Sequence, residues 1–221
     1  MSTESSGIKV VYKGGQDEIV EKKSRFIATV VPVETEEEAV AFINETKKKY
    51  WDARHNCSAF VIGSRQELTR CSDDGEPAGT AGRPMLDVLL KEDMHNVAVV
   101  VTRYFGGVLL GTGGLVRAYQ KATQQGLAAS EIITKQQGQI LLVHTDYTGL
   151  GKLQYIFAQE SITVMDTEYA ADVTIKVVIP MQEKARIEKL ITEQTNGTAG
   201  LEWTDEILFA LYNKEVLTWD K

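Results

Sequence analysis

The sequence predicts a mixed α+β protein made of two domains, residues 1–135 and 136–221. The apolar pattern of the chain stops in a polar stretch at 134–138 and starts again beyond it. Before that stretch, an unbroken and largely β-branched run at 97–102 predicts a buried central strand. With 221 residues, 43% of them hydrophobic, the chain has enough apolar content for two ordinary cores.

The first domain is expected to contain both strands and helices. Apolar periodicity and turn residues predict strands at 8–12 and 26–33 around a polar turn at 14–17, a helix at 35–50, a hairpin of 57–62 with 68–71, a helix at 85–90, the strand at 97–102 and a helix at 112–129. Thr35 and Glu38 have the spacing of a capping box, which marks the start of the first helix.

The second domain repeats a simpler pattern. We expect a strand at 140–145, a helix at 148–159, paired strands at 164–169 and 172–179, a helix at 183–195 and a last strand at 202–212. This βαββαβ order is typical of the ferredoxin-like split-βαβ arrangement.

The charge of the chain is unevenly distributed. The net charge is −7; residues 1–137 carry 17 Lys and Arg against 18 Asp and Glu, whereas residues 138–221 carry 7 against 13. Affinity for a nucleic-acid backbone comes from Lys and Arg that displace counterions, so the acidic region is a poor binder. We therefore expect any contact with RNA to be local and to lie in the first domain.

Two glycine-rich loops precede helices of the first domain. The candidate residues of the longer loop are Arg103, Tyr104, Gly106, Gly107, Gly111, Thr112, Gly113, Gly114 and Arg117. Those of the shorter loop are Gly79, Thr80, Gly82 and Arg83. Glycines permit positive φ, and a helix that begins after such a loop points free N–H groups at whatever lies there. We expect these loops to hold an anion, most simply a phosphate.

Arginines reinforce the anion prediction. Those that flank an expected strand end or a glycine loop are Arg54, Arg83, Arg103 and Arg117. A guanidinium there can bind phosphate or carboxylate through two N–H groups. His55 follows Arg54 and belongs to the same candidate site. Tyr104 could stack on a base, although packing at a strand end is the commoner role of such a residue.

An enzyme is the alternative interpretation of the same region. The candidate ligands for Mg²⁺ are Asp73, Asp74 and Glu76, although Asp-Gly and Glu-Pro are also ordinary turn sequences. Cys57 or Cys71 could instead act with His55 in a hydrolase, but no third residue that orients the histidine is visible in the sequence. A third interpretation is a protein–protein adaptor in which the loops are only packing turns.

Several classes of protein do not fit the sequence. No run of about 18 apolar residues occurs, so we expect no membrane span. The start of the chain lacks a signal-peptide pattern and the two cysteines make no disulfide framework, so we expect a cytoplasmic protein. Neither glycine loop has the Gly-Lys-Ser/Thr or G-x-G-x-x-G pattern of the common nucleotide-binding motifs.

Three motif blocks of the first domain together resemble the IMPACT family. They are Arg54-His55-x-Cys57-x-Ala59, Asp73-Asp74-Gly75-Glu76-Pro77-x-Gly79-Thr80-Ala81-Gly82-x-Pro84 and Val99-x-Val101-x-Arg103-Tyr104-Phe105-Gly106-Gly107-x-x-Leu110-Gly111-x-Gly113-Gly114-Leu115-x-Arg117-Ala118-Tyr119. The resemblance covers about residues 18–130 and implies an N-terminal α/β domain of the ribosomal protein S5 domain 2-like type. The two-domain layout resembles the bacterial members, whose C-terminal domain is similar to the ferredoxin-like domains of elongation factor G.

The resemblance also implies a role in translation, because eukaryotic relatives regulate that process. Our leading expectation is a non-enzymatic regulatory protein whose N-terminal domain engages RNA, the ribosome or a nucleotide through the arginines and glycine loops. The expected partners are then RNA, the ribosome or translation-factor-type proteins. No resident cofactor is expected, apart from the Mg²⁺ of the alternative interpretation.

Overall fold

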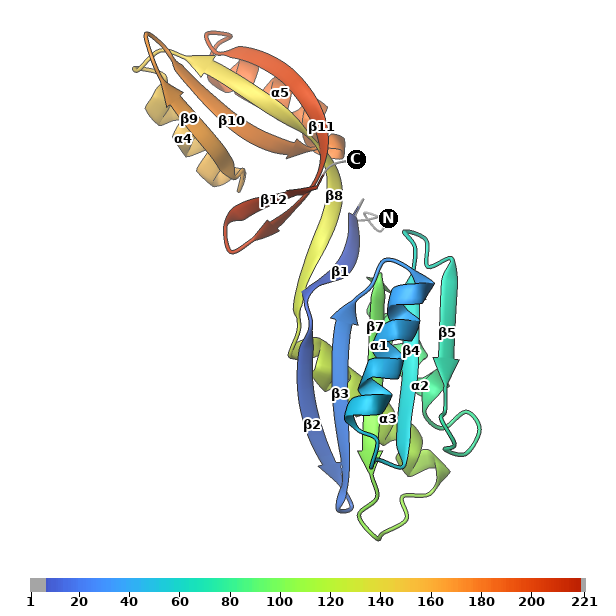
Figure 1. The fold of residues 1–221 in the computed structure, drawn as a ribbon. Coiled ribbons are helices and arrows are strands. Elements are labelled where there is room, and N and C mark those ends of the chain that lie inside the picture. Colours follow the sequence, from blue (N-terminus) through green and yellow to red (C-terminus); the bar gives the residue numbers. More distant parts are fainter. Residues whose placement is uncertain (1–6, 220–221) are drawn as a thin grey trace. The chain divides into compact units, whose positions relative to one another are not determined.

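The chain folds into two compact α+β units. A computed structural model describes residues 7–219 (Figure 1). One unit comprises residues 8–133, and residues 134–219 with Gly7 belong to the other. The boundary expected from the sequence lay after residue 135. Strand β8 (Glu131–Thr145) is continuous through the division, so its first residues belong to one unit and its remainder to the other.

The N-terminal unit is built on an antiparallel sheet covered on both faces. Its strands, in sheet order, are β2 (Gly15–Glu21), β3 (Ser24–Pro32), β7 (Val97–Tyr104), β4 (His55–Ile62) and β5 (Leu68–Ser72). Helices α2 (Gly82–Lys91) and α3 (Thr112–Ala128) share one apolar core with the sheet. Helix α1 (Glu36–Lys49) packs on the opposite face (Figure 1). Two further strands, β1 (Gly7–Lys13) and β6 (Met94–His95), pair in parallel.

Strand β7 is the buried centre of this sheet, as its sequence predicts. It lies between β3 and β4, and its residues 97–103 are buried. Branched side chains suit a strand that is covered on both faces. The strand ends at Arg103 and Tyr104, so the longer glycine loop starts at the edge of the core.

The beginning of the chain differs from the prediction. The polar turn expected at 14–17 is wrong, because β2 runs through most of it and pairs with β3 from Gly15↔Val30 to Glu21↔Ser24. The chain turns instead at Lys22 and Lys23, whose φ angles are 46° and 66°. Two successive residues with positive φ are typical of the tight turn that joins antiparallel strands.

Helix α1 starts as expected but with half of the predicted capping box. The side chain of Thr35 accepts a hydrogen bond from the N–H of Glu38 at 3.2 Å. The carboxylate of Glu38 accepts from the N–H of Glu34 at 2.7 Å, one residue before the cap. The three acidic residues of the first turn and the three lysines of the last turn complement the helix dipole.

The C-terminal unit has the predicted order of strands and helices, followed by one more strand. After β8 come α4 (Leu150–Gln159), β9 (Val164–Tyr169), β10 (Val173–Pro180), the short helix η1 (Met181–Glu183), α5 (Lys184–Gln194), β11 (Gly200–Tyr212) and β12 (Glu215–Trp219). The sheet order is β9–β10–β8–β11–β12, with antiparallel neighbours. Helices α4 and α5 share one apolar core with the sheet. None of the helices between residues 7 and 219 is long and apolar enough to cross a membrane.

Candidate functional site

The shorter glycine loop closes around a carboxylate of the protein itself. Oδ1 of Asp73 accepts from the backbone N–H groups of Ala81 at 3.0 Å and Gly82 at 2.8 Å. Oδ2 accepts from the N–H of Gly79 at 2.8 Å. The loop thus has the predicted anion-binding geometry, because free N–H groups at a helix start attract negative charge. The anion is Asp73, so the expectation of an external phosphate in this loop is wrong.

The pKa of Asp73 reflects this position. Burial is the largest single influence and raises the pKa, but the three backbone N–H donors together outweigh it and lower the pKa below its ordinary value. The loop also needs glycine at position 82, where an added Cβ would lie 2.7 Å from the backbone nitrogen of Ser72. A charged Asp73 and a close backbone contact therefore hold this loop in one conformation.

The longer glycine loop ends in an open helix start. Helix α3 follows Gly111, whose φ of 72° favours glycine. No side chain of residues 7–219 caps this helix, and its first turn holds no acidic residue. A Cβ added at Gly107, Gly111 or Gly113 would have no atom of the described chain within 4 Å. The first N–H groups of this 17-residue helix are therefore accessible to a ligand.

A cavity of about 460 Å³ lies beside the start of α3. Its ionisable lining residues are Arg54, His55, Glu76 and Arg103. Its apolar lining residues are Pro77, Phe105, Leu109, Leu110 and Leu115, and Gly75, Gly111 and Thr112 complete the lining. The fold thus assembles the cavity from the start of β4, the loop after β5, the end of β7 and the start of α3.

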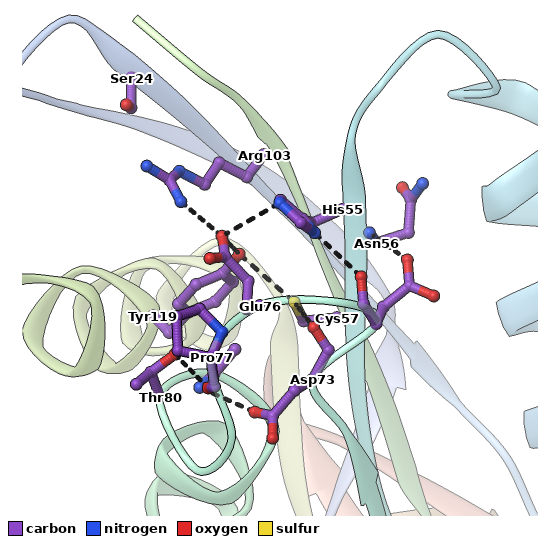
Figure 2. A network of polar contacts seen from close by, with 12 residues as sticks. Ser24, His55, Asn56, Cys57, Asp73, Glu76, Pro77, Thr80, Arg103 and Tyr119 are labelled. Carbon is purple, nitrogen blue, oxygen red and sulfur yellow. Dashed lines mark hydrogen bonds and ion pairs between the residues drawn. The ribbon is translucent and has the colours of Figure 1, made fainter. Parts of the chain in front are cut away.

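Glu76 is a buried carboxylate that collects donors from two elements (Figure 2). Its Oε1 accepts from Nη1 of Arg103 at 2.5 Å and from the hydroxyl of Tyr119 at 2.9 Å. Nε2 of His55 lies 3.9 Å from the same oxygen. The side chains of Glu76 and Arg103 are only 3% and 7% exposed, so the ion pair is shielded from water. We call these four residues the Glu76 network.

The guanidinium of Arg103 is held in one place and keeps a free donor. The rings of Phe26 and Phe105 lie 5.4 and 5.7 Å from its central carbon. Its Nε is buried and has no hydrogen-bond partner among the described residues. A buried donor without an acceptor costs about 1–3 kcal/mol. The buried pair with Glu76 and the two flanking rings therefore fix the position of Arg103 in the wall of the cavity.

The ring of His55 is oriented by the backbone. Nδ1 lies 2.9 Å from the carbonyl oxygen of Asp74. A carbonyl oxygen can only accept, so Nδ1 carries the hydrogen. In the neutral ring Nε2 is then the acceptor, and it lies on the side of Glu76 (Figure 2). The residue that orients the histidine acts through its backbone, and backbone roles leave no pattern in side-chain types along a sequence.

The position of Cys57 argues against this residue as the nucleophile of the cysteine–histidine hydrolase. Its side chain is fully buried in the core, and its thiol donates to the carbonyl oxygen of Asp73 at 3.0 Å. Burial, as the largest cause, raises the pKa of this thiol to about 12. The thiol is therefore uncharged near neutral pH, whereas the thiolate is the nucleophilic form. Cys71 is exposed, and its pKa is also raised, again chiefly by burial.

We expect only Cys71 to react with iodoacetamide in the folded protein. In a Cys71→Ser variant, Cys57 should remain unmodified at about pH 8, because its thiol is buried and its pKa is about 12. Mass spectrometry of the intact protein measures the modification, and a Cys57→Ser variant that retains Cys71 is the control. Rapid modification of Cys57 in the folded protein would restore the hydrolase interpretation.

The three candidate magnesium ligands bind three separate sets of partners. Asp73 holds the shorter loop, and Glu76 pairs with Arg103. Asp74 accepts from Nζ of Lys47 at 2.6 Å and from the N–H of Asn56 at 2.7 Å. Within residues 7–219, no group of three His, Cys, Asp or Glu could hold a metal ion. The fold does not bring these carboxylates together into one ligand set.

The four arginines are divided among three places. Arg54 and Arg103 line the cavity. Arg83 lies on α2 and pairs with Asp87 one turn later, with 2.8 Å between Nε and Oδ1. Arg117 lies on α3 and lines a second cavity of about 260 Å³. The structure therefore unites two of the four arginines at one site.

The second cavity forms part of a cationic surface. Lys22, Arg117 and Lys121 are exposed and line it together. Leu110 lines both cavities, so the second cavity borders the first along the longer glycine loop. We call these three cations the α3 patch. The sequence separates Lys22 from the other two by almost a hundred residues, and only the β2–β3 hairpin places it beside α3.

The remaining predicted site residues have structural contacts. The hydroxyl of Tyr104 donates to Asp52 at 2.8 Å, so its oxygen is engaged. The N–H of Gly106 donates to the hydroxyl of Ser24 at 3.2 Å. The hydroxyl of Thr80 donates to the carbonyl oxygen of Pro77 at 2.7 Å. Gly114 lines the second cavity.

Tyr119 contacts the candidate site, although the sequence names it only as the last residue of the third motif block. Its ring packs edge-on against Phe26 at 5.2 Å, while its hydroxyl reaches Glu76. Burial, as the largest cause, raises the pKa of this phenol above its ordinary value, so it acts as a donor. A buried tyrosine ring usually finds a hydrogen-bond partner for its hydroxyl, but the identity of that partner depends on the tertiary structure.

Comparisons with known proteins place the chain among related sequences. A family model described as the Impact N-terminal domain matches residues 22–127, and one described as a domain of unknown function (DUF1949) matches residues 143–198. The chain is 41% identical to IMPACT family member YvyE of Bacillus subtilis, over 86% of this chain and 88% of that one. It is 36% identical to IMPACT family member YigZ of Escherichia coli, over 81% and 89%. A crystal structure of a hypothetical protein aligns with a TM-score of 0.57 and 31% identity, covering 90% of this chain and 98% of that one.

Proposed function

Because the chain belongs to the IMPACT family, we propose that it is a translation-associated regulatory protein whose N-terminal unit binds RNA or a ribosomal surface. The connection with translation follows from the family resemblance of the motif blocks. The N-terminal unit then has the S5 domain 2-like fold and the C-terminal unit the ferredoxin-like fold. Its place of action would be the cytoplasm.

The α3 patch is the observation that carries this proposal. Its three cations are exposed, and none of them has an ion-pair partner among the described residues; Glu21 also lines the patch. In a chain with a net charge of −7, unpaired cations beside an open helix start form a local site for phosphate groups. Two of them, Arg117 and Lys121, are one turn apart on α3 and so project from the same face of the helix.

We expect an Arg117→Ala/Lys121→Ala variant to lose most of its association with ribosomes. Each Lys or Arg that contacts a phosphate contributes about 0.7–0.9 to the slope of log affinity against log salt, so the double change should reduce that slope by about 1.5. Co-sedimentation through a sucrose cushion across a salt series measures this. Both side chains are exposed, so the variant should fold normally.

A Lys152→Ala/Lys189→Ala variant is the matched control. It removes the same charge from exposed positions of the C-terminal unit, on α4 and α5. The proposal is supported if this control pellets with ribosomes as the wild-type protein does and the Arg117→Ala/Lys121→Ala variant does not. Equal pelleting of the two variants, or no pelleting of the wild-type protein at low salt, contradicts it.

A further inference from the structure

We infer that the cavity beside the start of α3 is a binding site for a mononucleotide. The phosphate would lie at the start of the helix, between Arg54 and Arg103, and the base would cover Phe105 and Leu109. This site is adjacent to the α3 patch but uses different side chains. It would make the N-terminal unit responsive to a small ligand, beyond its proposed contact with RNA or the ribosome.

The phosphate end of the site is built from three independent elements. The first turn of α3 supplies backbone N–H groups that no protein side chain caps within the described chain. Arg54, just before β4, is exposed and lines the cavity. Arg103, at the end of β7, lines the cavity and is held there by its ion pair with Glu76. Cationic and N–H groups that line one cavity from three elements suit a tetrahedral anion with several oxygens.

The charge at this end also fits a phosphate. Arg54 and Arg103 contribute two positive charges to the lining, and Glu76 contributes one negative charge. Glu76 and Arg103 form a buried ion pair that compensates both of these charges, so the positive charge of Arg54 remains. The positive end of the helix dipole adds to the excess of positive charge. A phosphomonoester, which carries up to two negative charges, complements this balance.

The remaining lining fits a planar, weakly polar group. Leu109 is 80% exposed and Phe105 is 46% exposed, although both are large apolar side chains. They line the cavity together with Pro77, Leu110 and Leu115. An aromatic ring such as that of Phe105 stacks well on a nucleobase. Covering these side chains would remove apolar surface from water.

The size of the cavity selects among phosphate-bearing ligands. Its volume of about 460 Å³ lies in the range of small-molecule sites and accommodates a phosphate, a ribose and a base. Inorganic phosphate alone would leave the apolar lining uncovered, and a nucleoside alone would leave the helix start and Arg54 without an anion. A nucleoside monophosphate satisfies both ends.

Isothermal titration of the full chain with AMP, GMP, CMP and UMP tests the inference. At least one monophosphate should bind at least about 10-fold more tightly than its nucleoside and than inorganic phosphate. Arg54→Ala should weaken that binding by about 10- to 100-fold, because a charge-assisted hydrogen bond is lost. Arg83→Ala is the matched control, since it removes an exposed arginine outside the cavity and should leave the affinity unchanged.

Gly113→Asp provides a variant that keeps the fold. An added Cβ meets no described atom within 4 Å there, and an acidic residue in the first turn of a helix is stabilising. Its carboxylate would occupy the helix start and repel the phosphate, so binding should fall by more than about 10-fold while the melting temperature holds or rises.

Three results would overturn the inference. They are the absence of binding of any monophosphate up to about 1 mM, equal affinities for nucleoside and monophosphate, and wild-type affinity in Gly113→Asp. Binding of a 5′-phosphorylated RNA hexanucleotide by a protein that ignores all four monophosphates would also overturn it. The ribosome assay on the Arg117→Ala/Lys121→Ala variant is independent, so failure of the nucleotide site and failure of the proposed function are distinguishable.

Discussion

Glu76→Ala is expected to lower the free energy of unfolding of the N-terminal unit by about 3–5 kcal/mol, the cost of breaking a buried ion pair from one side. Without Glu76, the guanidinium of Arg103 remains between two aromatic rings with no counter-charge, and Tyr119 loses the acceptor of its hydroxyl. Urea unfolding measures the effect. Hydrogen exchange of peptides from β7 then shows that the lost stability belongs to the N-terminal unit, because β7 is the centre of the sheet in that unit.

A double variant distinguishes the destabilisation caused by an uncompensated buried charge from that caused by lost packing. Glu76→Leu/Arg103→Met replaces the buried ion pair by apolar side chains of similar size, so it should be more stable than Glu76→Ala. Glu36→Ala is the surface control, because its ion pair with Arg70 is exposed and should contribute about 0–1 kcal/mol. A loss below about 1 kcal/mol in Glu76→Ala would show that Glu76 and Arg103 do not form a buried pair.

Asp73→Ala should be the second most damaging change, with a loss of about 2–3 kcal/mol at neutral pH. The variant leaves the N–H groups of Gly79, Ala81 and Gly82 without their acceptor, and two of these groups lie at the start of α2. Urea unfolding, followed by hydrogen exchange of peptides from α2, measures the loss in free energy of unfolding. Asp87→Ala is the control, because its exposed pair with Arg83 contributes at most about 0.5 kcal/mol.

The contribution of Asp73 should depend on pH in a defined direction. Its pKa in the folded protein lies below the ordinary value, so the unfolded chain binds the proton more readily. The stabilisation is fully present above the unfolded pKa of about 3.9 and disappears as the pH falls through the lower folded pKa. The stability difference between wild-type protein and Asp73→Asn should therefore shrink in acid. A difference that stays constant from neutral pH to about pH 3 would contradict the hydrogen-bonded position of Asp73.

The elements that the sequence predicts well are those with a strong local pattern. Residues 97–102 form the core of β7, and 112–129 form α3 almost to the residue, because branched and periodic apolar side chains indicate burial directly. Strand β2 was missed, since most of its side chains are exposed and it is held by backbone pairing with β3. Strand β12 was missed in the same way beside β11.

The sequence likewise predicts some residues of the candidate site correctly and misplaces others. Glycine spacing identified the two loops, and residue type identified Arg54, His55 and Arg103, because each property belongs to a residue or to its neighbours in the chain. The sequence also favoured Arg83 and Arg117 for the same site, whereas one is paired on α2 and the other lies in the α3 patch. Proximity to a loop in the chain does not fix the direction in which a long side chain projects.

By itself, then, the sequence determined the two α+β domains, the open glycine-rich start of α3 and the membership of the IMPACT family. Only the tertiary structure decided that one loop is filled by Asp73 while the other is open, and that Glu76 neutralises Arg103 inside the cavity wall. Residues 76, 103 and 119 come from the loop after β5, from β7 and from α3, and they meet only when these three parts pack together. Local patterns specify elements because they depend on neighbouring residues, whereas the partner of a buried charge depends on how distant elements pack.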